Sequence, residues 1–409
     1  MTVRILFFCI GAVAFLGATI LPVDQLAQYP PRTSQAITAL REAISRIETE
    51  QDSTVRCHRA DDILNRVKTS GGVLTEDSTV LFLYHGPARR VFIPGDMNGW
   101  SPSADSMRHI PQTELWYCIK SIPLRGRVEY KLIVDSTWLL DPLNPRQSAG
   151  GFGPNSEIRM PGYAPPPDIV PHKGVPHGRI DTIAFPSLTL ACSHPVFIYL
   201  PALSMHSDSA LPAIVITDGG DYLSLGRMSV VLDNLIAAGS IRPVIGVFVD
   251  PRTDIGNPAS NKRMAEYAIN DRFVSFVCDE LLPSLRKVYP IAGTPARTAI
   301  LGSSMGGLIA TYAAIRRPDV FGLCAAQSPS YWWRDNEIIT IVDSLPRKAV
   351  RFYIDTGTIH DAQVQTRLMQ EILSTKRYDF SYAEYPEGHN WSNWRSRLAK
   401  ILIHFWGTR

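Results

Sequence analysis

A glycine- and serine-containing pentapeptide between two apolar segments is the feature that most constrains this chain. Residues 302–306 read Gly-Ser-Ser-Met-Gly, after the strand-like run 298–301 and before a run of small apolar residues at 307–315. A strand, Gly-x-Ser-x-Gly and a helix in this order are typical of a nucleophile elbow. The sharp turn holds Ser304 in a strained conformation, and the flanking glycines remove β-carbons that would clash.

A nucleophilic serine needs a base, and His389 is the predicted one. In α/β-hydrolases the triad follows the chain order serine, acid, histidine. His389 lies on a loop after the strand-like segment 379–385, where the base of such an enzyme is expected. The other downstream histidines fit less well, because His360 precedes a helix and His404 belongs to an apolar helical pattern.

Two aspartates follow the strand-like segment 350–354 and compete for the role of the acid. We favour Asp361, which lies further out on the loop and reaches more easily toward His389. Asp355 directly ends the strand and remains the alternative. Either carboxylate would hold the imidazole in one tautomer while the serine forms an acyl-enzyme intermediate.

An oxyanion hole is also expected. One donor should be the backbone N–H of Met305, the residue after the nucleophile, and the other should come from the loop after an earlier strand. That strand is predicted at 213–217, and its loop contains Gly219 and Gly220. Glycines let a substrate oxygen approach the backbone closely, so both are candidate donors.

The length of 409 residues predicts two domains, and the pattern along the chain predicts an α/β class protein in which a doubly wound sheet is preceded by a smaller all-β sandwich. Short strand-like runs separated by Gly, Pro and Asn precede a proline-rich stretch, and alternating strands and helices follow it. The expected order is a signal peptide or N-terminal anchor (1–25), a helical segment (26–75), a β-sandwich (76–160), a proline-rich linker (161–178) and an α/β-hydrolase catalytic domain (179–409).

Several segments after residue 180 resemble the putative esterase family that includes the enterochelin esterases. The similarity spans about residues 180–405, in the family's order, over these segments: 214–222, 231–236, 263–267, 280–283, the elbow, 328–333 and 387–391. The resemblance implies serine esterase chemistry on an α/β-hydrolase fold. It does not imply one substrate, since similar proteins include siderophore, feruloyl and acetyl-xylan esterases and some acyltransferases.

The β-rich segment resembles a second kind of domain. Residues 92–100, 129–132 and 138–145 are similar to the immunoglobulin-like domain of glycogen-branching enzymes and enterochelin esterases. The resemblance implies an immunoglobulin-like sandwich. Trp100 and Trp138 are candidates to stack on sugar rings or to pack internally.

Substrate contacts are predicted at two places. Tyr331, Trp332 and Trp333 follow a strand at the catalytic end of the sheet and would suit a flat acyl or alcohol group. Arg263 and Glu266 are one helical turn apart and either face the pocket, as the resemblance implies, or form a surface pair.

The remaining composition bounds partners and location. The net charge of +3, with no basic stripe, gives no support for nucleic-acid binding. An apolar run from Ile5 to Leu21 follows one arginine, which predicts export by a signal peptide or N-terminal anchor and a catalytic domain outside the cytoplasm. The cysteines show no metal-ligand spacing, so we expect neither metal nor cofactor. Disulfides between Cys192 and Cys324, or between Cys57 and Cys118, stay open.

The sequence thus predicts a secreted, periplasmic or membrane-anchored serine ester hydrolase acting on a small-molecule or glycan ester. Three alternatives stay open: a feruloyl or acetyl carbohydrate esterase that docks glycans through the β-domain, an acyltransferase, and a non-catalytic binding protein on the same scaffold. The oligomeric state does not follow from the sequence.

Overall fold

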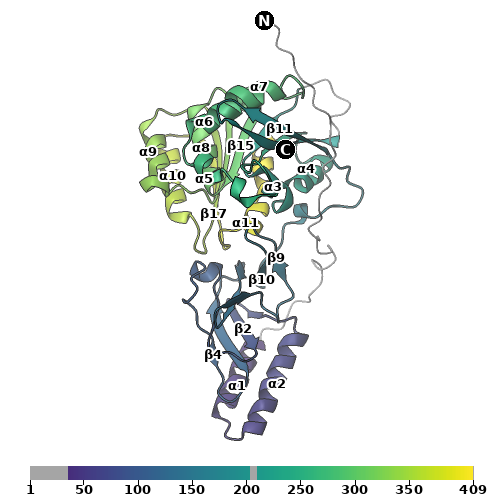
Figure 1. The fold of residues 1–409 in the computed structure, drawn as a ribbon, viewed down its shortest axis with the longest axis vertical. Helices are drawn as coiled ribbons and strands as arrows, with labels where there is room; N and C mark the ends of the chain where they lie inside the picture. The colour runs from purple at the N-terminus through teal and green to yellow at the C-terminus, as the bar shows by residue number, and fades with distance from the viewer. Residues whose placement is uncertain (1–35, 203–209, 409) are drawn as a thin grey trace. The chain divides into compact units, whose positions relative to one another are not determined.

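The computed structural model describes residues 36–202 and 210–408, which belong to one compact unit (Figure 1). The predicted signal peptide or anchor over residues 1–25 lies outside the described residues. Within the described ranges, no helix combines the length and the apolar character needed to cross a bilayer.

An eight-stranded sheet carries the second half of the chain, as predicted. The order is β11-β12-β14-β13-β15-β16-β17-β18. The pairs β11/β12 and β12/β14 are antiparallel, and every following pair is parallel. The bounds are β11 Arg179–Ser187, β12 Cys192–Leu200, β13 Ala213–Ile216, β14 Ile245–Val249, β15 Thr298–Ser303, β16 Leu323–Gln327, β17 Arg351–Gly357 and β18 Asp379–Tyr385.

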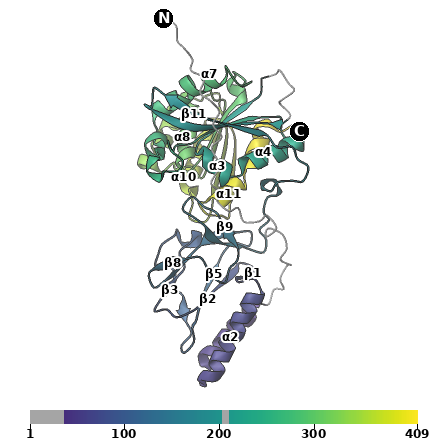
Figure 2. The same cartoon turned by 45° about the vertical axis from the view of Figure 1, so that its right-hand side comes forward.

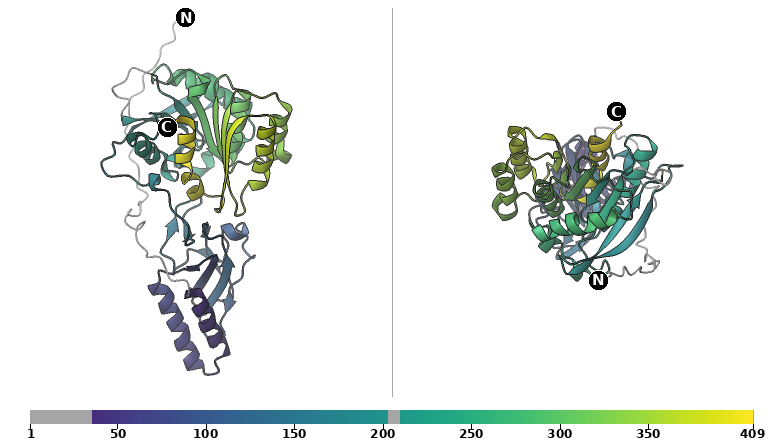
Figure 3. Two further views of the ribbon diagram at one scale, coloured as in Figure 1. Left: turned by 180° about the vertical axis from the view of Figure 1, so that it is seen from behind. Right: turned by 90° about the horizontal axis from the view of Figure 1, so that it is seen from above.

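Helices cover both faces of this sheet (Figure 3). Side chains alternate between two cores: Ile300 packs on one face, while Ala299 and Leu301 pack on the other. Both faces are buried, so these strands are continuous apolar runs. The first core includes α6 Asp271–Ser275, the π-helical η6 Phe276–Leu281, α7 Leu282–Leu285, α8 Met305–Arg316, α9 Trp333–Ser344 and α10 Gln363–Thr375. The second includes α3 Gly219–Ser224, α4 Met228–Ala237, α11 Trp391–Arg395 and α12 Leu398–Trp406.

The residues before the linker form two helices and small antiparallel sheets (Figures 1 and 2). The helices α1 (Ala36–Thr49) and α2 (Ser53–Thr69) pack against one side of β2 and β5, and Asp52 caps α2 through the N–H groups of Thr54 and Val55. The sheets are β1-β2-β5-β4, β3-β7-β8 and β6-β10-β9. Their bounds are β1 Leu74–Glu76, β2 Thr79–His85, β3 Val91–Phe92, β4 Arg108–His109, β5 Leu115–Ser121, β6 Arg127–Tyr130, β7 Leu132–Val134, β8 Thr137–Leu139, β9 Gln147–Ser148 and β10 Asn155–Arg159. The immunoglobulin-like topology stays a prediction.

Residues 128–134, whose sequence Val-Glu-Tyr-Lys-Leu-Ile-Val predicts one strand, form two strands in different sheets. The first, β6, pairs with β10, and the second, β7, pairs with β3 and β8. The break falls at Lys131, whose N–H donates to the carbonyl of Pro94 at 2.9 Å. The local sequence pattern of one strand-like segment cannot reveal such a change of partner.

The proline-rich segment between the two regions lies against α4. Asn234 on that helix donates through its side-chain amide to the carbonyls of Asp168 and Val170, at 2.9 and 2.8 Å. The short helix η3 (Pro167–Ile169) belongs to the same contact. Side-chain hydrogen bonds from the catalytic region therefore hold this segment in place.

All five cysteines of the described ranges carry free thiols, so neither of the two open disulfides is formed. Cys192 begins β12 and Cys324 lies in β16, with three strands between them in the sheet. Cys57 is exposed on α2, where its thiol lies 3.5 Å from the carbonyl of Gln112.

Candidate active site

Ser304 occupies a sharp turn between β15 and α8. Its backbone angles are φ 56° and ψ −121°, a region that residues other than glycine rarely adopt. The Ser304 N–H donates to the carbonyl of Gln327 at 2.9 Å, which ties the turn to β16. A β-carbon on Gly302 would lie 2.2 Å from the Gly306 backbone, and one on Gly306 would lie 2.4 Å from Thr217 Oγ1. Both glycines are therefore required by close approach, as the motif predicted.

Asp361, on the loop after β17, lies against His389. Its Oδ1 accepts from His389 Nδ1 at 2.7 Å, and its Oδ2 accepts from Ser328 Oγ and the Gly357 N–H, each at 2.6 Å. The Ala362 N–H also donates to Oδ1, at 2.8 Å. Burial alone would raise the pKa of Asp361, but the hydrogen bonds from His389 and Ser328 hold that pKa below its usual value. The carboxylate is therefore charged and can orient the imidazole.

Asp355, the alternative acid, lies inside the sheet away from His389. Its side chain is fully buried, its Oδ2 lies 3.4 Å from Gln327 Nε2, and its Oδ1 has no hydrogen-bond partner among the described residues. Burial raises the pKa of Asp355 to about 7. Of the two aspartates proposed from the sequence, the structure therefore brings only Asp361 to the histidine.

The hydroxyl of Ser304 has a different partner in this structure. Its Oγ lies 3.2 Å from Ser330 Oγ, and the described Ser304 and His389 side chains form no hydrogen bond with each other. Ser330 lies on the loop after β16, at the same edge of the sheet as the elbow. His389 is 38% exposed and Asp361 is fully buried, so the imidazole stands between the carboxylate and solvent.

Two residues that the sequence did not single out complete the surroundings of His389. Trp394 on α11 meets the imidazole edge to face, with ring centroids 5.0 Å apart, and its Nε1 donates to Ser328 Oγ at 3.0 Å. Ser328 in turn donates to Asp361. The signal for Ser328 was its place directly after β16, whereas nothing in the sequence placed Trp394 beside the histidine.

The two glycine candidates for the oxyanion hole differ. The N–H of Gly220 already donates to Asp250 Oδ2, at 2.9 Å. Gly219 begins α3 and Met305 begins α8, so their N–H groups have no acceptor within their own helices. Of the two glycine candidates, only Gly219 therefore keeps a free N–H group among the described residues, and it remains the candidate for the second donor together with Met305.

Arg263 and Glu266, on α5 (Arg263–Tyr267), do not pair with each other, so the structure excludes the surface pair, one of the two alternatives left open by the sequence. Arg263 donates to both carboxylate oxygens of Asp218, at 2.8 and 3.0 Å, and to the carbonyl of Ser303 at 3.1 Å. Glu266 is buried, and its carboxylate lies 3.0 Å from His194. Arg263 thus fastens the ends of β13 and β15 beside the elbow.

The three aromatic residues after β16 separate in the structure. Tyr331 is fully buried, with its hydroxyl 2.7 Å from Thr311 Oγ1, which excludes a contact with substrate. Trp332 is 52% exposed, and Trp333 meets it edge to face. Trp333 also lines an open hollow of ≈ 370 Å³ that contains none of Ser304, His389 and Asp361; the other lining residues are Met264, Ala265, Ala268, Ile269, Asn270, Asp271 and Arg334.

The loop of His389 is held by residues from the N-terminal β-region. Asn390 donates to Asp96 Oδ2 at 2.8 Å and accepts from Arg127 at 3.2 Å. Gly388 is so close to Asp96 that a β-carbon would lie 2.3 Å from the Asp96 Cγ atom. Asp96 is buried in η2 (Asp96–Asn98), part of the segment that resembles an immunoglobulin-like domain.

Comparison with known proteins places the chain in a family. The family model described as putative esterase matches residues 187–405, more than half of the chain. Over 300 residues the chain is 26% identical to the iron(III) enterobactin esterase of Dickeya dadantii, covering 62% of this chain and 65% of that protein. It is 25% identical to the Escherichia coli K12 protein of the same name over 338 residues, covering 74% of this chain and 82% of that protein.

Solved structures agree at the level of the fold. The enterobactin esterase of Shigella flexneri, crystallised in the presence of enterobactin, aligns with a TM-score of 0.70 and 23% identity, covering 84% of this chain and 97% of that one. The ferric enterobactin esterase of Salmonella typhimurium aligns with a TM-score of 0.71 and 22% identity, covering 84% and 98%. These likenesses support the α/β-hydrolase type of sheet.

Adding a methyl group at the elbow should damage the protein. We expect Gly302→Ala to lower the free energy of unfolding by about 1–3 kcal/mol or more, since its β-carbon meets backbone that cannot move aside. Gly293→Ala is the matched control, because a β-carbon there meets nothing within 4 Å. Urea denaturation of both variants gives the comparison, and equal stabilities would contradict the close packing at the elbow.

The buried carboxyl of Asp355 should make stability depend on pH. Its pKa of about 7, against a usual 3.8, means that the folded state binds more protons between these values. The contribution of the Asp355 carboxyl to the stability of the fold is therefore complete below about pH 3.8, and it is lost as the pH rises through about 7. The free energy of unfolding of Asp355→Asn should exceed that of the wild type by up to about 4 kcal/mol at pH 8 and by far less at pH 4.5.

Urea denaturation at both pH values tests this expectation. Asp343→Asn, at an exposed position, serves as the control and should show no such pH dependence. An Asp355→Asn variant that matches the wild type at pH 8 would show that the charged carboxylate is tolerated in the sheet.

Proposed function

We propose that this chain, which belongs to the putative esterase family and is an esterase, hydrolyses carboxylic esters with Ser304 as nucleophile. His389 acts as general base and Asp361 orients it. The observation that carries the proposal is the 2.7 Å hydrogen bond between His389 Nδ1 and the buried Asp361, beside an elbow that holds Ser304 at a positive φ. The three residues follow β15, β17 and β18, whose carboxyl ends meet at one edge of the sheet.

Proton transfer follows from the charges of these groups. Asp361 is a carboxylate and accepts a hydrogen bond from the Nδ1–H group of His389, which leaves Nε2 unprotonated and able to take the proton of Ser304. Rotation about the Cα–Cβ bond of Ser304 moves its hydroxyl from Ser330 toward the imidazole. The hydrogen bond between nucleophile and base then forms once substrate is bound, as catalytic hydrogen bonds tighten in the substrate complex. The serine oxygen attacks the ester carbonyl, the alcohol leaves with the proton from His389, and water then hydrolyses the acyl-enzyme.

The negative oxygen of the tetrahedral intermediate needs donors that are already in place. We assign the N–H groups of Met305 and Gly219, which begin two helices and have no intrahelical acceptor. The dipole of α8, a helix of twelve residues, adds a favourable field at Met305. Gly220 takes no part, because its N–H is bound to Asp250.

The substrate we propose is a small-molecule ester of the siderophore type. The support is the similarity to proteins named iron(III) enterobactin esterase, over up to 74% of this chain. Trp332, 52% exposed after β16, offers a flat surface for an aromatic acyl group. A feruloyl ester is the second candidate, favoured by 28% identity over 160 residues to a protein named endo-1,4-beta-xylanase/feruloyl esterase from Xylanibacter ruminicola.

Covalent labelling tests the nucleophile. A fluorophosphonate should modify Ser304 of the purified protein, located by mass spectrometry, and His389→Ala should abolish the labelling. Ser304→Ala and His389→Ala should each reduce kcat at least about 1,000-fold while circular dichroism stays unchanged, because triad members act as a unit. Unchanged turnover in either folded variant, or a folded wild type that takes no label, would contradict the proposal.

The identity of the acid follows from a matched pair of substitutions. We expect Asp361→Asn to lower kcat about 1,000- to 10,000-fold, since the amide favours the wrong histidine tautomer. Asp355→Asn should retain kcat within about 10-fold, because its carboxyl does not touch His389. Steady-state kinetics of both variants, with folding checked by thermal unfolding, identifies the acid. A larger loss of kcat in Asp355→Asn than in Asp361→Asn would contradict the assignment.

A panel of esters distinguishes the substrate classes. We expect a higher kcat/KM for enterobactin than for methyl ferulate, an acetylated xylan oligosaccharide or a short-chain p-nitrophenyl ester. The Ser304→Ala variant gives the background rate for each ester. Faster hydrolysis of methyl ferulate would replace the siderophore proposal with the feruloyl one while leaving the triad unaffected.

A further inference from the structure

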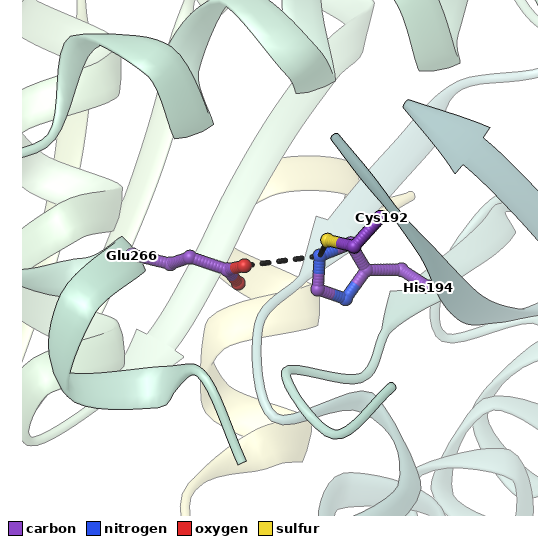
Figure 4. A group of neighbouring side chains, drawn as sticks. All are labelled: Cys192, His194 and Glu266. Carbon is purple, nitrogen blue, oxygen red and sulfur yellow. Dashed lines mark hydrogen bonds and ion pairs between the residues drawn. The ribbon is translucent and has the colours of Figure 1, made fainter. Parts of the chain in front are cut away.

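Three side chains with metal-binding atoms meet outside the proposed active site (Figure 4). Cys192 and His194 lie two residues apart on β12, so both side chains project from the same face of that strand. Glu266 reaches them from α5. The Nε2 atom of His194 lies 3.4 Å from Cys192 Sγ and 3.0 Å from Glu266 Oε1. One donor atom from each residue lies within 4.8 Å of the others.

The imidazole of His194 is oriented as a ligand would be. Its Nδ1 lies 2.9 Å from the carbonyl of Asp250, and its side chain is fully buried. A metal-binding histidine typically donates its other ring N–H to a backbone carbonyl or carboxylate, which fixes the tautomer. Here that bond directs Nε2 toward both Cys192 and Glu266.

One carboxylate oxygen of Glu266 is buried without a hydrogen-bond partner. The side chain is 6% exposed, and its Oε2 atom has no hydrogen-bond partner in the described part of the chain. A buried carboxylate oxygen without a partner is costly. A cation held by the carboxylate would satisfy it, whereas a hydrogen-bonded pair with His194 alone does not.

From this arrangement we propose that Cys192, His194 and Glu266 bind one Zn²⁺ ion. In a tetrahedral zinc site with bond lengths of about 2.0–2.3 Å, the edge from nitrogen to oxygen is about 3.4 Å and the edge from nitrogen to sulfur about 3.6 Å. The observed distances of 3.0 and 3.4 Å are within 0.4 Å of these edges. Along these two edges, small side-chain movements therefore suffice, and the donor atoms of Cys192 and Glu266 lie within 4.8 Å of each other.

The donor set selects the metal. One thiolate, one imidazole and one carboxylate suit zinc, whereas calcium and magnesium prefer oxygen ligands only. Three protein ligands leave a fourth position for water. Cys192 is only partly buried, so an ion can enter from its side of the site.

The ion would connect two elements that support the active site. Glu266 lies one turn after Arg263 on α5, and Arg263 binds Asp218 and the carbonyl of Ser303 beside the nucleophile. Cys192 and His194 belong to β12. Zinc would therefore tie α5 to β12 and fix the helix from which Arg263 reaches the elbow. We assign it no part in ester cleavage.

The test uses the full-length protein, treated with a chelator and then titrated with ZnCl₂ or CoCl₂. We expect one equivalent of Zn²⁺ to bind by isothermal titration calorimetry, and one equivalent of Co²⁺ to produce a near-ultraviolet thiolate charge-transfer band. Cys192→Ser should abolish the band, and Cys192→Ser and His194→Asn should each weaken Zn²⁺ binding at least about 100-fold, beyond the effect of losing an outer-shell partner.

Two controls make each outcome decisive. Cys57→Ser, at an exposed cysteine on α2, and Ser304→Ala should both bind the metals as the wild type does. X-ray absorption of the cobalt-loaded wild type should report one sulfur ligand, a result that does not depend on whether a variant folds. Absence of the band and of stoichiometric Zn²⁺ binding in the wild type, or binding that survives both ligand substitutions, would overturn the proposal.

Discussion

The positive φ of Ser304 is the constraint on which the rest of the proposed site depends. A serine in this conformation is strained by about 1–3 kcal/mol and persists only where its surroundings over-determine it. Here the N–H bond to Gln327 holds the turn from β16, and the contact of Gly302 with Gly306 holds the start of α8 against the end of β15. The turn lies in the middle of the sheet, so the loops after the neighbouring strands surround the hydroxyl.

The histidine depends on a second set of constraints, made of buried charge. Arg127 is fully buried and donates to Glu157 at 2.7 Å, to Glu129 at 2.8 Å and to Asn390. The charge of Arg127 holds the pKa of Glu157 at about 2 although burial opposes this. Removing one partner would leave the others charged and uncompensated, so such a cluster is stable only when complete. It fastens the loop of His389 to a region 263 residues earlier in the chain.

Much of the fold and the nucleophile could be predicted because the signals are local. Buried parallel strands are continuous apolar runs, and the elbow requires its two glycines within five residues. The choice between Asp361 and Asp355 could be argued but not decided, since both follow β17 and differ only in which way the loop turns. Tyr331 shows the limit of composition, because an aromatic residue on a loop at the catalytic edge is fully buried.

By itself the sequence determined the alternation of strands and helices after residue 210, the elbow at Ser304 and the position of His389 on the loop after the last strand, because backbone geometry and hydrophobic periodicity depend on neighbouring residues. Only the tertiary structure decided which atoms meet. It brought Asp361 to His389, occupied the N–H of Gly220 with Asp250, and gathered Glu266 with Cys192 and His194. These contacts join residues far apart in the chain, and their distances depend on packing that no local pattern records.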